Sequence, residues 1–360
     1  MKLNQFSRMI VLGAGTVWRP ESVRTLPIHI QIEPTNFCNL DCITCPRSQM
    51  IKNPENMSLD SFKKIVDEVS PAKITLSGLG EPLINPELFK MIKYSQGRGI
   101  SANVTTNGIL LERHIDEIIE SGLSLLSISI DAAGKETYKA IRRSSDFQKV
   151  IASVKDLIEQ RKDQGKNYPS VRTHFVIQKD NLSEIEKFIE LNYNLSVDAI
   201  YFQPLDLSGM EDRKKFLIGD ITFEEVHERL KTANSLGKRL GILTNLGELI
   251  SNFRLYWKKY SFQKIKERRC LLPWFSAYIK VDGSVCPCCA FAMTDVSLGN
   301  CLDEGFNTVW NNRQFKKIRG ELRQNIRSYE ICKNCVPSTL FEILYSKAKY
   351  TPGFMKLFGD

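Results

Sequence analysis

The chain has 360 residues, of which 42% are hydrophobic and 25% are charged, and its formal net charge is +9. This length and composition are those of an ordinary globular protein with two or three domains, and the short apolar runs and the absence of a signal peptide predict a cytoplasmic protein without membrane insertion. The Lys and Arg residues are spread along helix faces without interleaved aromatic residues, so we expect no nucleic-acid partner.

The first predicted element is a strand over residues 28–33, in which apolar and polar residues alternate. A loop with Cys38, Cys42 and Cys45 follows at the spacing C-x3-C-x2-C, and the next cysteine is Cys270. Thiolates at this spacing bind iron–sulfur clusters, and a cube held by three thiolates leaves one iron open for a substrate or cofactor. The alternatives are a zinc site or buried thiols, but zinc favours paired C-x2-C arms.

From residue 28 to about residue 205, short β-rich segments alternate with amphipathic helical segments. The sequence predicts strands over residues 28–33, 73–77, 101–105, 125–130, 172–178 and 199–203. It predicts helices over residues 58–69, 85–97, 112–121, 147–161 and 182–191. Six such units imply parallel strands joined by right-handed crossovers, and they are too few for a closed eight-unit barrel. We therefore predict an α/β fold with an open, partial (β/α)6 TIM-like barrel.

Polar or glycine-rich segments follow several of these strands, at the end of the barrel where chemistry collects. Residues 77–82 follow the second strand, where glycines allow a ligand to approach the backbone and Glu81 offers an acceptor. Ser129 and Asp131 end the fourth strand, and side chains two residues apart in a strand point the same way. Alone, such loops are also consistent with ordinary helix starts.

The pattern changes after residue 209. A capping box at residues 222–225 predicts a helix that ends at Gly237, and an aromatic-rich, basic helix is predicted over residues 249–269. Seven of the ten cysteines then lie between residues 270 and 335, with a hairpin turn at residues 282–283. A reducing compartment disfavours disulfides, so two separate groups of cysteines indicate two metal centres.

The three-cysteine loop resembles that of the radical S-adenosylmethionine (SAM) superfamily, whose members bind SAM on the open iron of a [4Fe–4S] cluster. Residues 78–82, Gly-Leu-Gly-Glu-Pro, are similar to the GGEP motif of that family. The resemblance implies ribose contacts at the end of strand four, adenine near Phe37 and Gln203, and a SAM carboxylate on Arg142, or on Arg143 in its place. The residues predicted to bind SAM are Phe37, Gly78, Gly80, Glu81, Pro82, Asn107, Ser129, Asp131, Arg142 and Gln203.

The C-terminal cysteines resemble the SPASM pattern, an auxiliary-cluster extension of many radical SAM enzymes. Residues 270–288 match its opening, C-x12-G-x4-C, and residues 332–335 supply a closing C-x2-C pair. The resemblance implies one auxiliary [4Fe–4S] cluster, as in the shortened twitch variants. Its predicted ligands are Cys270, Cys288, Cys332 and Cys335, and the surplus cysteines are Cys286, Cys289 and Cys301. Cys289 is an alternative to Cys288, because adjacent residues in extended backbone point opposite ways. A zinc ribbon is the alternative reading of the whole module.

The predicted domains follow from these boundaries. They are an N-terminal extension (1–25), the radical SAM core barrel (26–215), a helical connector (216–269), the SPASM/twitch-like domain (270–338) and an amphipathic tail (339–360). The tail is expected to pack on the auxiliary domain, and contact with a membrane surface is the alternative.

The resemblance implies an enzyme that cleaves SAM reductively to a 5′-deoxyadenosyl radical, which abstracts hydrogen from a substrate C–H bond. It also implies a flavodoxin- or ferredoxin-type electron donor. The 25 residues before the first strand are too few for a leader-binding domain, which favours a biosynthetic metabolite over a peptide as substrate. The alternatives are a peptide- or protein-modifying maturase, an RNA-modifying radical SAM enzyme, and a non-enzymatic iron–sulfur or zinc regulator that binds nucleic acid.

Overall fold

The computed structural model describes residues 8, 11, 13, 15, 17–205, 221–260, 269–333 and 335–337. The predicted amphipathic tail over residues 339–360 lies outside this part of the chain, as does the predicted helical segment over residues 261–268. Within the described ranges, no helix has the length and apolar character that a membrane crossing requires.

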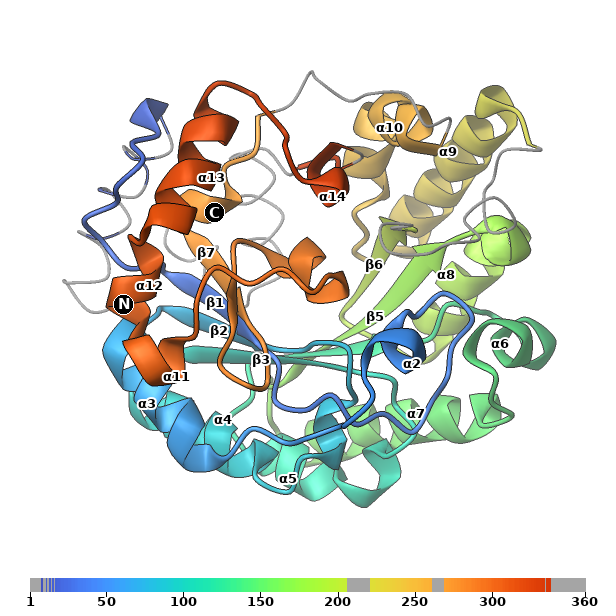
Figure 1. The fold of residues 1–360 in the computed structure, drawn as a ribbon. Coiled ribbons are helices and arrows are strands. Elements are labelled where there is room, and N and C mark those ends of the chain that lie inside the picture. The colour runs from blue at the N-terminus through green and yellow to red at the C-terminus, as the bar shows by residue number, and fades with distance from the viewer. Residues whose placement is uncertain are drawn as a thin grey trace.

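One eight-stranded sheet forms the centre of the molecule, in the order β6-β5-β4-β3-β2-β1-β7-β8 (Figure 1). The strands are β1 (His29–Ile32), β2 (Lys73–Leu76), β3 (Ser101–Thr106), β4 (Leu125–Ser129), β5 (Ser170–Ile177), β6 (Ala199–Pro204), β7 (Ser276–Ile279) and β8 (Val285–Cys286). Neighbours from β6 to β7 are parallel, and only β8 runs antiparallel to its neighbour. The predicted parallel, partial barrel is confirmed.

Helices cover the outer side of the curved sheet (Figure 1). The barrel helices are α3 (Leu59–Val69), α4 (Leu88–Gly97), α5 (Ile115–Glu120), α6 (Lys135–Arg142), α7 (Phe147–Asp163) and α8 (Ile185–Asn194). Strand residues such as Ile30 and Ile74 are fully buried in one core with helix residues such as Phe62 and Met91. The alternate strand residues keep partial exposure, so the barrel has an apolar outer layer and a more polar inner face.

Two helices follow the barrel, and they differ from the prediction at their ends. They are α9 (Phe223–Leu240) and α10 (Leu246–Tyr260). Thr222 caps α9 as expected, but the helix passes through Gly237 and ends at Gly241, whose φ is 72°. A Cβ on Gly237 would lie 3.4 Å from Thr244, which is ordinary van der Waals contact, so the packing here does not require a glycine. Asn245 then caps the outer edge of β6 by hydrogen bonds with the backbone of Phe202.

The cysteine-rich module is joined directly to the barrel, because β7 pairs with β1 along its whole length. The predicted hairpin turn at residues 282–283 is confirmed, since it links β7 to β8. The helices of this module are α11 (Cys301–Glu304), α12 (Phe306–Trp310), α13 (Arg313–Arg323) and α14 (Glu330–Lys333). Residues 20–25 lie against it, where Trp274 and Trp310 donate to the carbonyls of Pro20 and Thr25.

Candidate active site

The loop with the first three cysteines leaves the carboxyl end of β1 and leads to α2 (Arg47–Met50). Neighbouring elements hold it through its backbone: Ile43 N donates to the Ile141 carbonyl of α6 at 3.0 Å, and Arg47 Nε donates to the Asn36 carbonyl at 2.9 Å. All three cysteines are partly buried. The loop is therefore a defined structure at the predicted end of the barrel.

Two polar side chains from the barrel approach these thiols. Asn107 Nδ2 lies 3.9 Å from Cys38 Sγ, and Arg142 Nη1 lies 3.8 Å from Cys42 Sγ. Burial, followed by the charges of Cys42 and Cys38, raises the pKa of the Cys45 thiol to about 11, so the three sulfurs lie close enough to affect one another. A cluster of several irons fits this donor set, because soft thiolates bind it and a guanidinium offsets their charge.

Among the residues that the structure describes, no three His, Cys, Asp or Glu side chains are grouped closely enough to hold a single metal ion. A zinc ion requires its sulfur ligands at about 2.3 Å from one centre.

The glycines of residues 78–82 pack against the cysteine loop. A Cβ on Gly80 would lie 2.2 Å from the carbonyl oxygen of Thr35 and 2.6 Å from that of Phe37. A Cβ on Gly78 would lie 2.4 Å from a carboxylate oxygen of Glu33. We predicted that these glycines let a ligand approach, but in the described structure they let two loops approach each other. Phe37, whose carbonyl accepts from Glu81 N at 2.7 Å, is 36% exposed.

The carboxylate of Glu81 is fully engaged with the protein itself. It accepts hydrogen bonds from Thr106 Oγ1 at 2.7 Å, Asn107 N at 2.6 Å and Leu83 N at 3.0 Å. The side chain is 1% exposed, and burial raises its pKa. We expected this carboxylate to accept a hydrogen bond from SAM, but the geometry shows it bonded to the protein. Glu81 instead fixes the loop that carries Asn107. Pro82 is buried in the first turn of the short helix η1 (Pro82–Ile84).

Asp131 and Arg142 form a buried ion pair, with 2.6 Å between Asp131 Oδ2 and Arg142 Nη2. Asp131 also accepts from Val176 N at 2.7 Å. Our prediction that Ser129 and Asp131 point the same way assumed extended backbone at both, and this is wrong: β4 ends at Ser129 and Asp131 has φ 61°. Asp131 contacts Arg142, the residue that we predict to bind the SAM carboxylate.

The guanidinium of Arg142 has a donor to spare. Its Nε is buried and has no hydrogen-bond partner among the described residues. Burial favours loss of its charge, but Asp131 and Cys42 outweigh burial and raise its pKa. A buried, charged donor beside the three cysteines fits a bound carboxylate.

Ser129 and Gln203 lie near the carboxyl ends of β4 and β6, and both side chains keep partial exposure. His174 on β5 is paired in register with Ser129 and lies 5.3 Å, ring to ring, from Tyr201. Burial, then the charges of Arg172 and Arg142, lower the pKa of His174 to about 3, and a hydrogen bond with Gln203 opposes this. The imidazole is therefore neutral at physiological pH.

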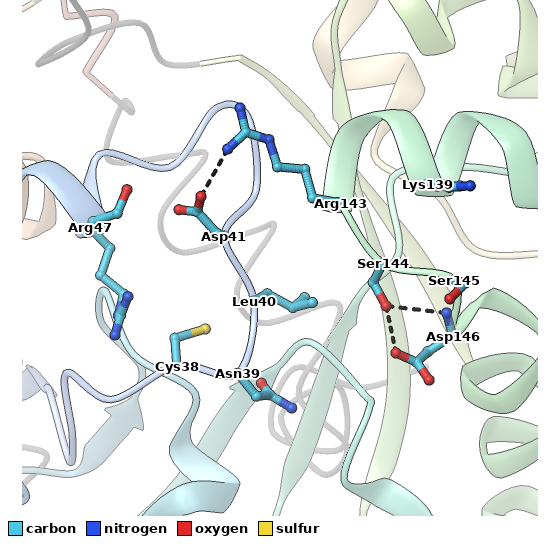
Figure 2. Close-up of a pocket in the computed structure, with 11 residues that line it drawn as sticks. Cys38, Asn39, Leu40, Asp41, Arg47, Lys139, Arg143, Ser144, Ser145 and Asp146 are labelled. Atoms are coloured by element: carbon cyan, nitrogen blue, oxygen red, sulfur yellow. Dashed lines mark hydrogen bonds and ion pairs between the residues drawn. The ribbon is translucent and has the colours of Figure 1, made fainter.

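Arg143 lies away from this group, although it adjoins Arg142 in the chain. It ends α6 in the left-handed conformation, with φ 53°, and pairs with Asp41 at 2.8 Å on the surface. Both side chains line a pocket of about 960 Å³ on the outer side of the cysteine loop (Figure 2). The structure thus separates the two arginines and leaves Arg142 in the interior.

The four predicted auxiliary ligands come together from three segments of the C-terminal module. Burial raises the pKa of Cys288 well above its usual value, and the charges of Cys289, Cys270 and Cys335 add to it. Burial and Cys270 likewise raise the pKa of Cys332 to about 12. Cys289 exerts the largest of these charge effects, so the electrostatics bring the predicted ligands near one another without choosing between Cys288 and Cys289. Arg327 Nη1 steadies the closing pair by donating to the carbonyls of Cys332 and Cys335.

The surplus cysteines divide into two kinds. Cys286 and Cys301 are buried, and their thiols contact the carbonyl oxygens of Val296 at 3.3 Å and Gly283 at 3.1 Å. Cys289 is exposed, whereas the extended Cys288 is partly buried. This agrees with opposite directions for the adjacent pair, and the choice of Cys288 as ligand stays a prediction.

The sequence analysis missed Glu33, which links the two halves of the molecule. Its carboxylate accepts from Leu79 N at 2.7 Å and from Val281 N at 3.3 Å, so it contacts both the glycine loop and the residue after β7. Glu33 is 3% exposed, and burial raises its pKa. In the sequence, the sign of this role was a carboxylate residue at the end of a predicted strand.

Comparison with known proteins identifies two domains in the chain. Residues 32–191 match the radical SAM superfamily, and residues 270–336 match the SPASM iron–sulfur cluster-binding domain. A tungsten-containing aldehyde ferredoxin oxidoreductase cofactor-modifying protein from Pyrococcus furiosus is 25% identical over 85% of this chain and 86% of its own. The AdoMet-dependent heme synthase of Methanosarcina barkeri is 27% identical over 81% and 85%. A GTP 3′,8-cyclase from Clostridium botulinum is 30% identical over 55% of this chain and 62% of its own.

Solved structures share the fold. Streptococcus suis SuiB bound to S-adenosylmethionine superposes with a TM-score of 0.65 at 15% identity, over 91% of this chain and 76% of SuiB. Native anSMEcpe with bound AdoMet has a TM-score of 0.62 at 19% identity, over 86% of each chain. Together with the three-cysteine loop at the end of a partial parallel barrel, these matches show a radical SAM domain over residues 32–191 and a SPASM domain over residues 270–336.

Proposed function

We propose that this radical SAM enzyme oxidises or rearranges a biosynthetic metabolite by abstracting hydrogen from one of its C–H bonds. When bound, the cluster and SAM supply the radical chemistry, in which reductive cleavage of SAM yields methionine and a 5′-deoxyadenosyl radical. The observation that carries the proposal is the buried, charged Arg142, which lies 3.8 Å from Cys42 Sγ and has a buried Nε without a partner among the described residues. In this proposal, Arg142 would bind the carboxylate of a SAM molecule held beside the three cysteines.

The residues of the chain have proposed roles toward these groups. Cys38, Cys42 and Cys45 would hold the cluster that binds SAM, and Arg142 would bind the SAM carboxylate, with Asp131 orienting the guanidinium. The backbone of residues 78–82 would receive the SAM amino group. The remaining contacts would come from Phe37, Asn107, Ser129 and Gln203. Enclosure at this end of the barrel would align the target hydrogen and exclude water.

A second [4Fe–4S] cluster would bind to Cys270, Cys288, Cys332 and Cys335. It would take up an electron from the substrate radical in an oxidation, or have a structural role in a redox-neutral reaction. The spacing of these thiols and their mutual effects on pKa support a shared centre.

A metabolite is the favoured substrate class, in the cytoplasm where thiolate clusters persist. The names of the relatives support this class, because they describe enzymes that act on a cofactor, on heme or on GTP. The electron donor would be a flavodoxin- or ferredoxin-type protein.

Anaerobic reconstitution tests the reaction. The protein is loaded with iron and sulfide, and dithionite and SAM are added. We expect 5′-deoxyadenosine and methionine in equal amounts, measured by liquid chromatography. The absence of 5′-deoxyadenosine from a preparation with about eight irons per chain would refute the assignment.

A further inference from the structure

The pocket in Figure 2 has no part in the roles assigned so far, yet a predicted cluster ligand forms part of its wall. Its volume is about 960 Å³, and Cys38 lines it together with residues 39–41 of the same loop. Asn107 of the barrel also lies near Cys38, with 3.9 Å between its Nδ2 and the cysteine Sγ. Cys38 therefore lies between the inner site and a surface pocket.

Three cations surround this pocket. Arg47 comes from α2, Lys139 from α6 and Arg143 from the end of α6. Within the described ranges, neither Arg47 nor Lys139 forms an ion pair; Arg47 donates through Nε to a backbone carbonyl. Asp41 is paired with Arg143, and both side chains are more than half exposed. The balance of charge at the rim is positive.

The second carboxylate of the pocket is that of Asp146, which forms a hydrogen bond within its own loop. It accepts from Ser144 Oγ at 2.5 Å at the start of α7, as Figure 2 shows. An anionic partner that approaches the pocket therefore meets the cations Lys139 and Arg143 on the exposed surface of α6. Complementary charge of this kind speeds encounter and fixes orientation.

We propose that the rim of this pocket is the docking surface for an acidic one-electron carrier protein, which reduces the cluster from the side of Cys38. This inference rests on the proposed function, because reductive cleavage of SAM consumes one electron. In the step, the carrier is oxidised by one electron and the cluster on Cys38, Cys42 and Cys45 is reduced by one. A flavodoxin hydroquinone anion would become the neutral semiquinone.

Binding of purified carriers to the cluster-loaded enzyme tests the surface. The probes are oxidised bacterial flavodoxin and bacterial ferredoxin, measured by interferometry at low and high salt. For the carrier that binds, Lys139→Glu with Arg143→Glu should raise Kd about tenfold at low salt, and Asp41→Asn should lower it about twofold. The control, Lys162→Glu with Lys166→Glu, makes the same charge change at the far end of α7 and should shift Kd by less than about twofold.

Turnover separates this inference from the proposed function. In the Lys139/Arg143 variant, 5′-deoxyadenosine formation driven by the reduced carrier should fall, while formation driven by dithionite should match wild type. Lys139→Glu alone serves if the double variant is unstable. Three results would overturn the docking surface. They are a wild-type Kd in the Lys139/Arg143 variant or in Lys139→Glu, an equal rise in Kd in the control variant, and no binding of either carrier. No product with dithionite would instead refute the proposed function, and the Kd values would still decide the docking surface.

Discussion

The two cysteine sites of this protein are built in opposite ways. In the barrel site, three cysteines lie within residues 38–45 of one loop. Side chains from other elements, such as Asn107 and Arg142, lie near them. In the auxiliary site, the predicted ligands are spread over residues 270–335, and the backbone of three separate segments must meet before the thiols form a group. The ligands of the barrel site are close together in sequence, and only the residues around them come from distant segments. In the auxiliary site, the ligands themselves come from distant segments.

This difference predicts how each site depends on folding. A local loop keeps its cysteines together even when the barrel around it loosens, so damage there should impair chemistry more than assembly. A site assembled from separate segments should instead contribute to the stability of its domain, because metal binding then also closes the chain.

The largest effect should come from removing the barrel cysteines. The triple variant Cys38→Ala, Cys42→Ala and Cys45→Ala should make no detectable 5′-deoxyadenosine, because the cluster proposed to bind SAM would lose all three of its ligands. Iron analysis should show about half of the wild-type content of about eight per chain. Product at the wild-type rate would show that the two sites are not distinct in role.

Loss of the closing pair should remove the other half of the iron and lower stability. Cys332→Ala with Cys335→Ala should leave about four irons per chain and lower the unfolding temperature more than the barrel triple variant does. Cys286→Ala and Cys301→Ala are matched controls, since both thiols bond to backbone carbonyls, and they should not change the iron content. Iron near twelve per chain in wild type would instead indicate a third cube.

The packing of the glycine loop on the cysteine loop gives a steric test. Gly80→Ala places a methyl group 2.2 Å from a backbone oxygen, so one loop must move, at a cost of about 1–3 kcal/mol. We expect weaker SAM binding and lower iron occupancy at the barrel site alone, measured by calorimetry and by iron analysis of the Cys332/Cys335 variant background. The control is Gly97→Ala in α4, where no atom lies within 4 Å of the new methyl group.

Replacing Arg142 tests the contact made from outside the cysteine loop. Arg142→Gln should weaken SAM binding by about 1.5–3 kcal/mol, which corresponds to a roughly ten- to hundredfold rise in Kd, because a charged hydrogen bond is lost. Arg143→Gln should leave the Kd for SAM unchanged, since Arg143 pairs with Asp41 on the surface. Equilibrium binding to the reconstituted protein measures both, and the reverse result would transfer the role to Arg143.

The smallest effect is a pH dependence confined to the barrel. The pKa of His174 is lowered to about 3 in the folded protein from the ordinary value of 6.5. Between about pH 6.5 and pH 3, His174 is therefore protonated in the unfolded chain and neutral in the folded chain. The free energy of unfolding decreases as the pH falls through this range. At pH 5.5 the loss should be about 1 kcal/mol relative to pH 7. Urea unfolding at both pH values should show a smaller loss in His174→Gln, and equal losses would contradict the assignment.

Much of the fold was predictable from local patterns, and the reasons are physical. Alternation of apolar and polar residues located all six barrel strands within a few residues, because a strand that buries one face leaves this period of two in the sequence. The cysteine spacing predicted both metal centres, because ligands of one centre recur at short, fixed separations, and their individual ligands stay a prediction. Helix ends were less certain: Gly237 resembled a stop signal, but α9 continues through it to Leu240.

The details of the site were less predictable, since they depend on contacts between distant segments. Nothing local to residues 78–81 shows that Gly80 meets the Thr35 carbonyl, or that Glu81 is already bonded to residues 106 and 107. The left-handed backbone at Asp131 likewise turned an expected ribose contact into an ion pair with Arg142. Family resemblance named the residues, and tertiary contacts decide which atoms are available.

The pairing of β7 with β1 has a consequence for synthesis of the chain. His29 and Ser276 are bonded neighbours across these strands but are separated by 247 positions. At about 5–20 residues per second, a ribosome finishes β1 roughly 12–50 s before it makes β7. During that time the nascent barrel has an exposed parallel edge, which is prone to pair with other chains. We expect truncation before residue 270 to yield aggregating protein, and slower translation between β6 and β7 to increase the need for chaperones.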